Sequence, residues 1–182
     1  MNIGLTQRVL FHNNKAYDSL EHGWYRFLKG HTLFFVSNRL DQDFTELANT
    51  LDCLIITGGD DSAIRRTTEL KLATKMMALQ KPILGVCHGC FLLQDVLGGT
   101  IADIEEHHNT EHDVFYNDKK YNVNSYHALS IKQLHSNGKV LVTDKDNNIE
   151  AWIDNNIAGV VWHPERMETP WLPIEIINLL GI

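Results

Sequence analysis

The first half of the chain alternates short, wholly apolar runs with longer segments whose apolar residues recur at helical spacing. Continuous apolar runs of this length are typical of strands that are buried on both faces. Strands are predicted at residues 2–6, 32–36, 52–57 and 83–86. Helices are predicted between and after them at residues 19–29, 42–51, 68–79 and 92–97. This alternation predicts an α/β fold with a mostly parallel central sheet and helices on both faces.

After Gly99 the pattern changes to short strands separated by turn residues. Asn117-Asp118 and the segment 144–148 are predicted as turns, which favours antiparallel or mixed pairing in this half. The predicted strands lie at residues 114–116, 121–123, 140–143, 149–152 and 158–162, and a last helix lies at residues 171–180. The sequence shows no internal repeat and no linker, so a single domain spanning residues 1–182 is expected.

The segment Gly85-Val86-Cys87-His88-Gly89 joins a predicted buried strand to a predicted helix. It matches the nucleophile-elbow pattern, in which small neighbours allow a sharp strand-to-helix turn, with cysteine as the nucleophile. A thiol at the N-terminus of a helix is favoured as thiolate by the helix dipole. Cys87 is therefore the candidate nucleophile, and a buried cysteine in an ordinary turn is the alternative.

Two further groups point to the same edge of the predicted sheet. The apolar strand at residues 52–57 runs directly into Gly58-Gly59, and the last strand runs into Trp162-His163-Pro164-Glu165. Ligands of parallel sheets bind beyond the carboxyl ends of the strands. His163 and Glu165 are two residues apart, so in extended backbone they leave the same face. A histidine held by a carboxylate is the pair that activates a thiol.

Composition narrows the choice of partners. The formal net charge of −7 over 182 residues argues against nucleic acid or an anionic membrane as a partner. The hydrophobic fraction of 43% is typical of a globular domain, and the three cysteines do not suggest a disulfide framework. Since the N-terminus lacks the layout of a signal peptide, a cytoplasmic location is expected.

These residues together resemble the class I glutamine amidotransferase superfamily. The resemblance rests on Gly58-Gly59, on Gly-x-Cys-x-Gly around Cys87 and on His163-Pro164-Glu165, and it covers nearly the whole chain. Within the superfamily the chain looks closest to stand-alone γ-glutamyl hydrolases of the γ-glutamyl-GABA hydrolase type. The segments 3–8, 124–127 and 148–151 resemble, more narrowly, γ-glutamyl-CDP-amidate hydrolases of capsule biosynthesis.

The resemblance implies a flavodoxin-like fold and a cysteine-dependent hydrolysis of a γ-glutamyl amide. Cys87 would attack the amide carbon, His163 would move the proton, and Glu165 would orient His163. The backbone N–H groups of Gly59 and His88 would bind the oxyanion. Ser125, Tyr126 and His127 match the family segment that holds the α-amino and α-carboxylate end of glutamate. No metal or organic cofactor is expected, because these groups suffice.

The chain departs from the family pattern at two positions. Phe91 stands where the family has a substrate-contacting glutamine, and a phenyl ring cannot make the hydrogen bonds of an amide. Glutamine itself is therefore in doubt as the substrate, and Gln94, one helical turn later, is a candidate replacement. Arg66 stands where related hydrolases tend to have aspartate.

Two other interpretations of the motifs remain open. Cys87-His88-Gly89-Cys90 is also a C-x-x-C motif, which suggests a thiol–disulfide protein, although the glycines and His163 would then have no role. Glu105, Glu106, His107, His108, Glu111 and His112 suggest a metal site if His108 and His112 share a helix face. Asn109 and Thr110 favour a solvated loop before the strand at residues 114–116, and no second ligand pair stands out.

Two interpretations concern the role of the whole domain. It can be a non-catalytic binding module, in which case Cys87 would not react with thiol reagents. It can also be a glutaminase that feeds ammonia to a synthase, which would have to be a separate chain. A small γ-glutamyl molecule is the expected ligand, and either a synthase partner or a homo-oligomer fits the sequence.

Overall fold

The computed structural model describes residues 1–104 and 107–182. The parallel sheet that the sequence predicts is present, with its strands in the order β4-β1-β5-β6-β13; β13, predicted in the antiparallel or mixed half, pairs with β6 in parallel. Their bounds are β1 (Asn2–Thr6), β4 (Thr32–Val36), β5 (Cys53–Ile56), β6 (Ile83–Val86) and β13 (Ile157–Val160). All eight residues of β5 and β6 are buried, which explains their continuous apolar sequences.

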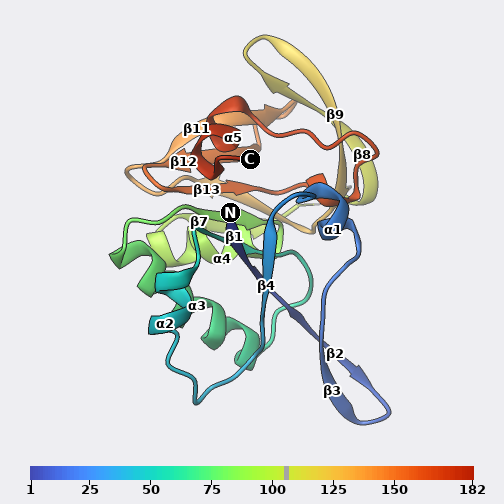
Figure 1. Ribbon diagram of the computed structural model, residues 1–182. Coiled ribbons are helices and arrows are strands. Elements are labelled where there is room, and N and C mark those ends of the chain that lie inside the picture. Colours follow the sequence, from blue (N-terminus) through green and yellow to red (C-terminus); the bar gives the residue numbers. More distant parts are fainter. Residues whose placement is uncertain (105–106) are drawn as a thin grey trace.

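Helices cover both faces of this parallel part (Figure 1). On one face, Leu54 and Ile56 belong to a core shared with α2 (Thr45–Thr50), α3 (Ala63–Ala78) and α4 (His88–Leu97). On the other face, Ile55 and Leu84 belong to a core shared with α1 (Gly23–Phe27) and α5 (Ile174–Leu180). Within the described ranges, each of these helices is too short or too polar to cross a membrane.

The sheet continues as an antiparallel half beyond β13. Its strands follow in the order β12 (Ile149–Asp154), β11 (Lys139–Asp144), β8 (His108–Tyr116) and β9 (Lys119–Tyr126). β10 (Leu129–Gln133) pairs with β12 and with β7 (Thr100–Asp103). Asn117 and Asp118 form the β8–β9 turn, both with positive φ, which confirms the predicted hairpin.

A second hairpin was not predicted from the sequence. β2 (Arg8–His12) and β3 (Lys15–Ser19) form a separate two-stranded sheet that extends away from the domain (Figure 1). Its turn residues Asn13 and Asn14 have φ of 49° and 58°, the conformation of a two-residue hairpin turn. Neither face of the hairpin is buried, so no hydrophobic alternation marks it in the sequence.

Several predicted boundaries were wrong. The first helix spans Gly23–Phe27 rather than 19–29, because residues up to Ser19 belong to β3. The third helix starts at Ala63 rather than 68, where the hydroxyl of Ser62 accepts a hydrogen bond from the backbone N–H of Arg65 at 3.4 Å. β8 starts at His108 rather than 114, so the expected solvated loop is a strand, and β7 and β10 were missed.

Candidate active site

Cys87 lies at the sharp turn between β6 and α4. Its φ of 49° is positive, which is strained for a residue with a side chain and is typical of a nucleophile elbow. A Cβ at Gly85 would lie 2.4 Å from the carbonyl oxygen of Gly89, and a Cβ at Gly89 would lie 2.1 Å from that of Ile56. Gly85 is therefore required by the turn itself and Gly89 by the close approach of β5, and the turn places Cys87 at the N-terminus of α4.

His163 and Glu165 lie beside Cys87 at the carboxyl edge of the parallel strands. His163 follows β13, and Glu165 lies in the short 3-10 helix η1 (Pro164–Arg166). His163 Nδ1 is 2.7 Å from Glu165 Oε1, and both residues are almost fully buried. A Cβ at Gly58 would lie 2.2 Å from His163 Cε1, so the loop after β5 packs directly against the imidazole.

The environment of His163 favours its protonated form. Burial alone would lower the pKa of His163, but hydrogen bonds to Cys87 and Glu165 and the charge of Glu165 more than offset this and raise it to about 9. His163 therefore carries a proton near neutral pH. An imidazolium beside a cysteine favours the thiolate.

Asn124 fixes the backbone of His163, a contact that the sequence did not predict. Its side chain donates to the carbonyl oxygen of His163 at 2.8 Å and accepts from the N–H of His163 at 2.9 Å. Asn124 belongs to β9, at the far end of the antiparallel half. This reciprocal pair ties the antiparallel half to the position of His163.

A buried ion pair supports the loop that carries Gly58 and Gly59, and it too was missed. Arg65 Nε lies 2.8 Å from Glu69 Oε1, and both side chains are fully buried. The guanidinium of Arg65 donates to the carbonyl oxygens of Thr57 at 2.5 Å and of Asp60 at 3.0 Å. The available signal was Glu69, a charged residue on the apolar face of the predicted helix at 68–79, with an arginine four residues before it, although Arg65 itself lay outside the predicted helix.

Glu69 also fixes the start of α4. It accepts a hydrogen bond from the hydroxyl of Thr6 at 2.7 Å, and its Oε2 lies 2.8 Å from His88 Nε2. Burial would raise the pKa of Glu69, but the hydrogen bond from His88 and the charge of Arg65 outweigh it and lower this pKa. Glu69 thus connects β1, α3 and the residue that follows Cys87.

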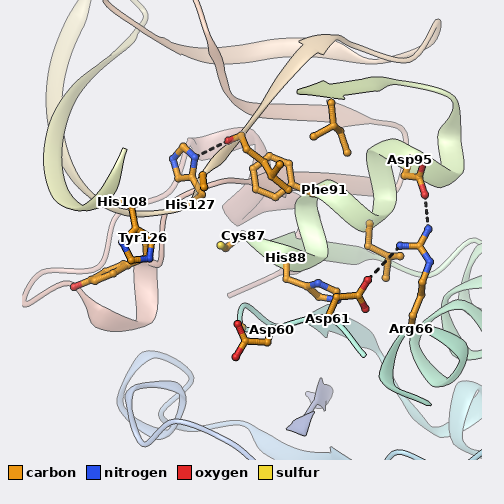
Figure 2. A pocket seen from close by; sticks show the side chains of 15 residues that line it. Asp60, Asp61, Arg66, Cys87, His88, Phe91, Asp95, His108, Tyr126 and His127 are labelled. Atoms are coloured by element: carbon orange, nitrogen blue, oxygen red, sulfur yellow. Dashed lines mark hydrogen bonds and ion pairs between the residues drawn. The ribbon is translucent and has the colours of Figure 1, made fainter. Parts of the chain in front are cut away.

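A cavity of about 450 Å³ opens beside Cys87 (Figure 2). Its lining includes the predicted site residues Gly59, Cys87, His88, Phe91, Tyr126 and His127. It also includes Asp60, Asp61, Arg66 and Asp95, where Arg66 is ion-paired with both Asp61 and Asp95. Gly59 has a φ of 121°, which favours glycine. The cavity is large enough for a ligand bigger than one amino acid.

Tyr126 is held over this cavity by an arginine. The guanidinium carbon of Arg166 lies 4.6 Å from the centre of the Tyr126 ring, which in turn lies edge-on to His163 at 5.6 Å. Arg166 also forms two hydrogen bonds with Glu21, at 2.7 and 2.8 Å. Burial opposes ionisation of Glu21, but hydrogen bonds from Arg166 and Arg8 lower its pKa to about 2.

The side chains of two predicted residues, Gln94 and Ser125, form hydrogen bonds within the protein and do not line the cavity. Gln94 is fully buried and does not line the cavity, because its amide binds the ring Nδ1 of His135 at 2.9 Å and the N–H of His135 at 3.3 Å. The suggestion that Gln94 replaces the family glutamine is therefore wrong. Ser125 is fully buried and does not line the cavity, and its hydroxyl donates to the carbonyl oxygen of His107, so the predicted substrate contact of Ser125 is not formed in this cavity.

The structure also bears on the two alternative interpretations of the motifs. Cys90 is fully buried and accepts a hydrogen bond from Trp152 Nε1 at 3.2 Å, and burial raises the pKa of its thiol, which argues against a redox pair with Cys87. For the metal interpretation, His108 and His112 lie on a strand rather than a helix. Glu105 and Glu106 lie outside the described residues.

The chain belongs to the class I glutamine amidotransferase family, whose model matches residues 15–177. It is 28% identical to the γ-glutamyl-CDP-amidate hydrolase of Campylobacter jejuni, over 91% of this chain and 90% of the relative. It is 27% identical to a glutamine-hydrolyzing GMP synthase subunit of Natronomonas pharaonis, over 91% of each chain. A glutamine amidotransferase from Thermotoga maritima shares the fold, with a TM-score of 0.70 at 13% identity over 98% of this chain and 79% of the other.

Proposed function

We propose that the chain hydrolyses a γ-glutamyl amide to glutamate and an amine, with Cys87, His163 and Glu165 as catalytic residues. The observation that carries this proposal is the arrangement at the edge of the parallel strands. A cysteine at a helix N-terminus contacts a histidine whose other ring nitrogen lies 2.7 Å from a buried carboxylate. Acyl transfer through a covalent intermediate requires a nucleophile, a base beside it and a carboxylate that orients the base.

In the proposed first step, the thiolate of Cys87 attacks the amide carbon of the γ-glutamyl group. The negative charge moves to the carbonyl oxygen, where the backbone N–H groups of Gly59 and His88 would stabilise it. The C–N bond then breaks as His163 donates its proton to the leaving amine. In the second step, His163 accepts a proton from water, the hydroxide attacks the thioester, and glutamate leaves as the thiolate re-forms.

The cavity supports a substrate larger than glutamine. In this proposal Tyr126 and His127 line the end of the cavity that holds the amino-acid end of the glutamyl group, beside Cys87. The amine part then extends toward Asp60, Asp61 and Arg66 of the cavity lining. Phe91, with 6% of its surface exposed, gives the cavity an apolar wall. A side chain able to form hydrogen bonds with an amide would be needed at this position to select glutamine, and a phenyl ring cannot form them.

A second candidate function is that of a glutaminase that delivers ammonia to a separate synthase chain. The similarity over 91% of the chain to a glutamine-hydrolyzing GMP synthase subunit favours it. Chemistry at Cys87 would be the same, so the two functions differ in substrate and in dependence on a partner.

The first experiment measures glutamate release by the purified chain alone. The substrates are glutamine and γ-glutamyl amides of a neutral, a cationic and a phosphate-bearing amine. We expect release from at least one of the larger amides and little from glutamine. In the same assay Cys87→Ser is expected to lower kcat by more than about 10⁴-fold, as removal of a nucleophile does in comparable enzymes.

Cys53→Ser serves as the control, since Cys53 is a buried cysteine of β5 outside the cavity lining. It should retain the activity of the parent if it folds. Hydrolysis by Cys87→Ser at the parental rate would refute the mechanism. No release from any amide, with Cys87 still reactive toward iodoacetamide, would favour the partner-dependent glutaminase over the hydrolase.

A further inference from the structure

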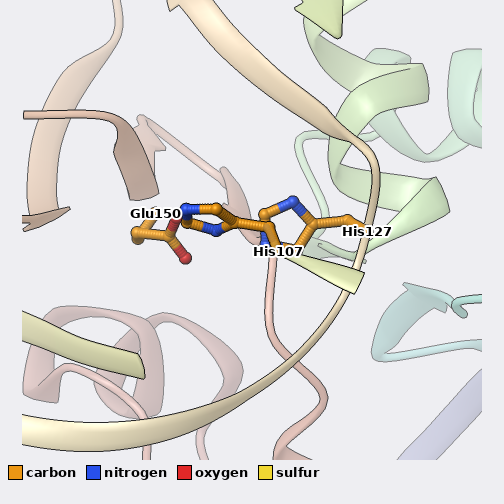
Figure 3. A group of neighbouring side chains, drawn as sticks. All are labelled: His107, His127 and Glu150. Carbon is orange, nitrogen blue, oxygen red and sulfur yellow. The ribbon is translucent and has the colours of Figure 1, made fainter. Parts of the chain in front are cut away.

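Four side chains gather inside the antiparallel half, and the proposed function uses only one of them, His127, as part of the cavity wall. We call His107, His112, His127 and Glu150 the histidine cluster. His112 lies on β8, His107 directly before it, His127 directly after β9, and Glu150 on β12. Figure 3 shows His107, His127 and Glu150 converging from these separate segments. His127 is 4% exposed and Glu150 is 1% exposed.

The distances within the histidine cluster suit joint coordination. One ligand atom from each of His107, His127 and Glu150 lies within 4.8 Å of the other two. The ring centres of His107 and His127 are 5.1 Å apart, and those of His107 and His112 are 4.7 Å apart. His112 Nε2 lies 3.3 Å from Glu150 Oε2, so His112 adjoins the three-residue set.

Polar atoms of the histidine cluster are buried without hydrogen bonds to any described residue. They include His127 Nε2, Glu150 Oε2, His107 Nδ1 and both ring nitrogens of His112. The 3.3 Å approach of His112 to Glu150 lacks the angles of a hydrogen bond. Buried polar groups are normally partnered, and several unpartnered groups converging on one point indicate a missing ligand.

The tautomer of His127 follows from its other nitrogen. His127 Nδ1 lies 2.7 Å from the carbonyl oxygen of Leu129, so Nδ1 carries the proton and donates it. Nε2 is then a free lone pair that faces the cluster.

A carboxylate also lies beside His107, at ion-pair rather than hydrogen-bond distance. Asp144 Oδ2 is 3.6 Å from His107 Nε2, while the Asp144 carboxylate is held by the backbone N–H groups of Asp146 and Asn148 at 2.9 and 2.8 Å. Outer carboxylates of this kind orient metal-binding histidines. Nδ1 of His107, which has no described partner, is the nitrogen left for a metal.

We propose that His107, His127 and Glu150 bind one divalent transition-metal ion, with His112 as the fourth ligand. Imidazole nitrogens with one carboxylate favour zinc, whereas calcium and magnesium require mostly oxygen ligands. Ligand atoms around a tetrahedral zinc lie about 3.4 Å apart, as bond lengths of about 2.0–2.1 Å require. Rotations of the side chains that draw the ligand atoms together by up to about 1.4 Å would complete the site.

A metal here would be structural in its effect. It would link β8, the segment between β9 and β10, and β12, which lie far apart in sequence. His127 also lines the cavity beside Cys87, so the ion would fix one wall of that cavity. The inference depends on the histidine cluster alone and holds whether or not Cys87 is catalytic.

The test is zinc titration of the full chain carrying Cys87→Ser, which prevents binding of the metal by the cysteine–histidine pair. Metal is first removed with a chelator, and zinc is then titrated in competition with a chromophoric chelator. We expect one zinc per chain and a rise in Tm with zinc concentration. Cobalt in place of zinc should give the visible absorption of a tetrahedral nitrogen–oxygen site.

Single variants then assign the ligands. His127→Gln and Glu150→Gln should each weaken zinc binding by at least about 10–100-fold, the loss that follows removal of even the outer partners of metal ligands. His107→Asn, at a partly exposed position, provides the same test if the buried variants do not fold. His108→Gln is the matched control, because His108 is the exposed neighbour of His107. Its zinc affinity should equal that of the parent.

Absence of stoichiometric zinc binding would overturn the proposal. So would zinc binding that survives substitution of His107, His127 and Glu150, or that is lost with His108→Gln, because the metal would then be held by exposed histidines.

Discussion

The parallel and antiparallel halves of the sheet present their polar groups in different ways. In the parallel half, β5 and β6 are buried along their whole length, and the polar groups lie beyond the strand ends, at Cys87 and Gly59. In the antiparallel half, buried polar side chains lie within or beside the strands, as Glu150 on β12 does. The first arrangement is built by turns of the backbone, and the second by the register of strands that are distant in sequence.

Because of this difference, we expect substitutions in the two halves to change stability by different amounts. The edge of the parallel half is held by the fully buried pair Arg65–Glu69, which reaches three segments around Cys87. The ion pair at the tip of the β8–β9 hairpin, between Lys120 and Asp113, is solvent-exposed. We therefore expect perturbations to be large around Glu69, intermediate at His163 and very small at the hairpin tip.

The largest effect on stability is expected for Glu69→Gln. The substitution keeps the shape of the side chain but leaves the guanidinium of Arg65 buried without its counter-charge. Breaking a buried pair in this way lowers the free energy of unfolding by about 3–5 kcal/mol. Urea denaturation followed by circular dichroism measures it.

Glu46→Gln provides the matched control, since Glu46 is an exposed glutamate of the neighbouring helix α2. It should leave the midpoint of unfolding unchanged. Equal effects of the two substitutions would show that the buried pair does not hold the edge of the parallel half.

An intermediate effect is expected in the pH dependence of hydrolysis. Because the pKa of His163 is raised to about 9, the proton required by the leaving amine is present at neutral pH and is lost above pH 9. The profile of kcat/KM should therefore fall on the alkaline side near pH 9. Glu165→Gln removes one cause of the raised pKa and should move this descending limb to lower pH.

The same pKa has a consequence for stability. The pKa of His163 is higher in the folded chain than its ordinary value of 6.5, so its contribution to the free energy of unfolding is complete below pH 6.5 and is lost as pH rises through about 9.

Glu168→Gln is the control for the activity profile. It changes an exposed glutamate three residues after Glu165 and should leave the descending limb of kcat/KM in place. A limb that does not respond to Glu165→Gln would mean that another group titrates there.

The sequence predicted the parallel half well because its signals are local. A Cβ at Gly85 would lie 2.4 Å from the carbonyl oxygen of Gly89 within the same turn, and His163 is only two residues from Glu165. The apolar strands are short and continuous, so their positions were predicted within one residue for β1, β4, β5 and β6. Helix ends were less accurate, since Ser62 caps a helix that starts in a polar sequence.

The antiparallel half was predicted poorly for a physical reason. The polar segment before Val114 has the pattern of a loop, because its histidines meet His127 and Glu150 only after β8, β9 and β12 have come together. Spacing along the chain contains no information about that contact. The Asn124–His163 clamp was missed likewise, since the two residues are 39 apart in sequence. The roles assigned to the catalytic and substrate-binding residues stay predictions.

The smallest effect is expected for Lys120→Ala. Lys120 Nζ lies 3.0 Å from Asp113 Oδ2, but the two side chains are 63% and 43% exposed. Water and salt screen such a pair, and the entropy lost in ordering a lysine side chain offsets its attraction. The urea midpoint should therefore stay within experimental error, at both low and high salt. A decrease as large as that of Glu69→Gln would mean that the hairpin tip supports the fold as strongly as the buried edge does, and the two halves would not differ as argued.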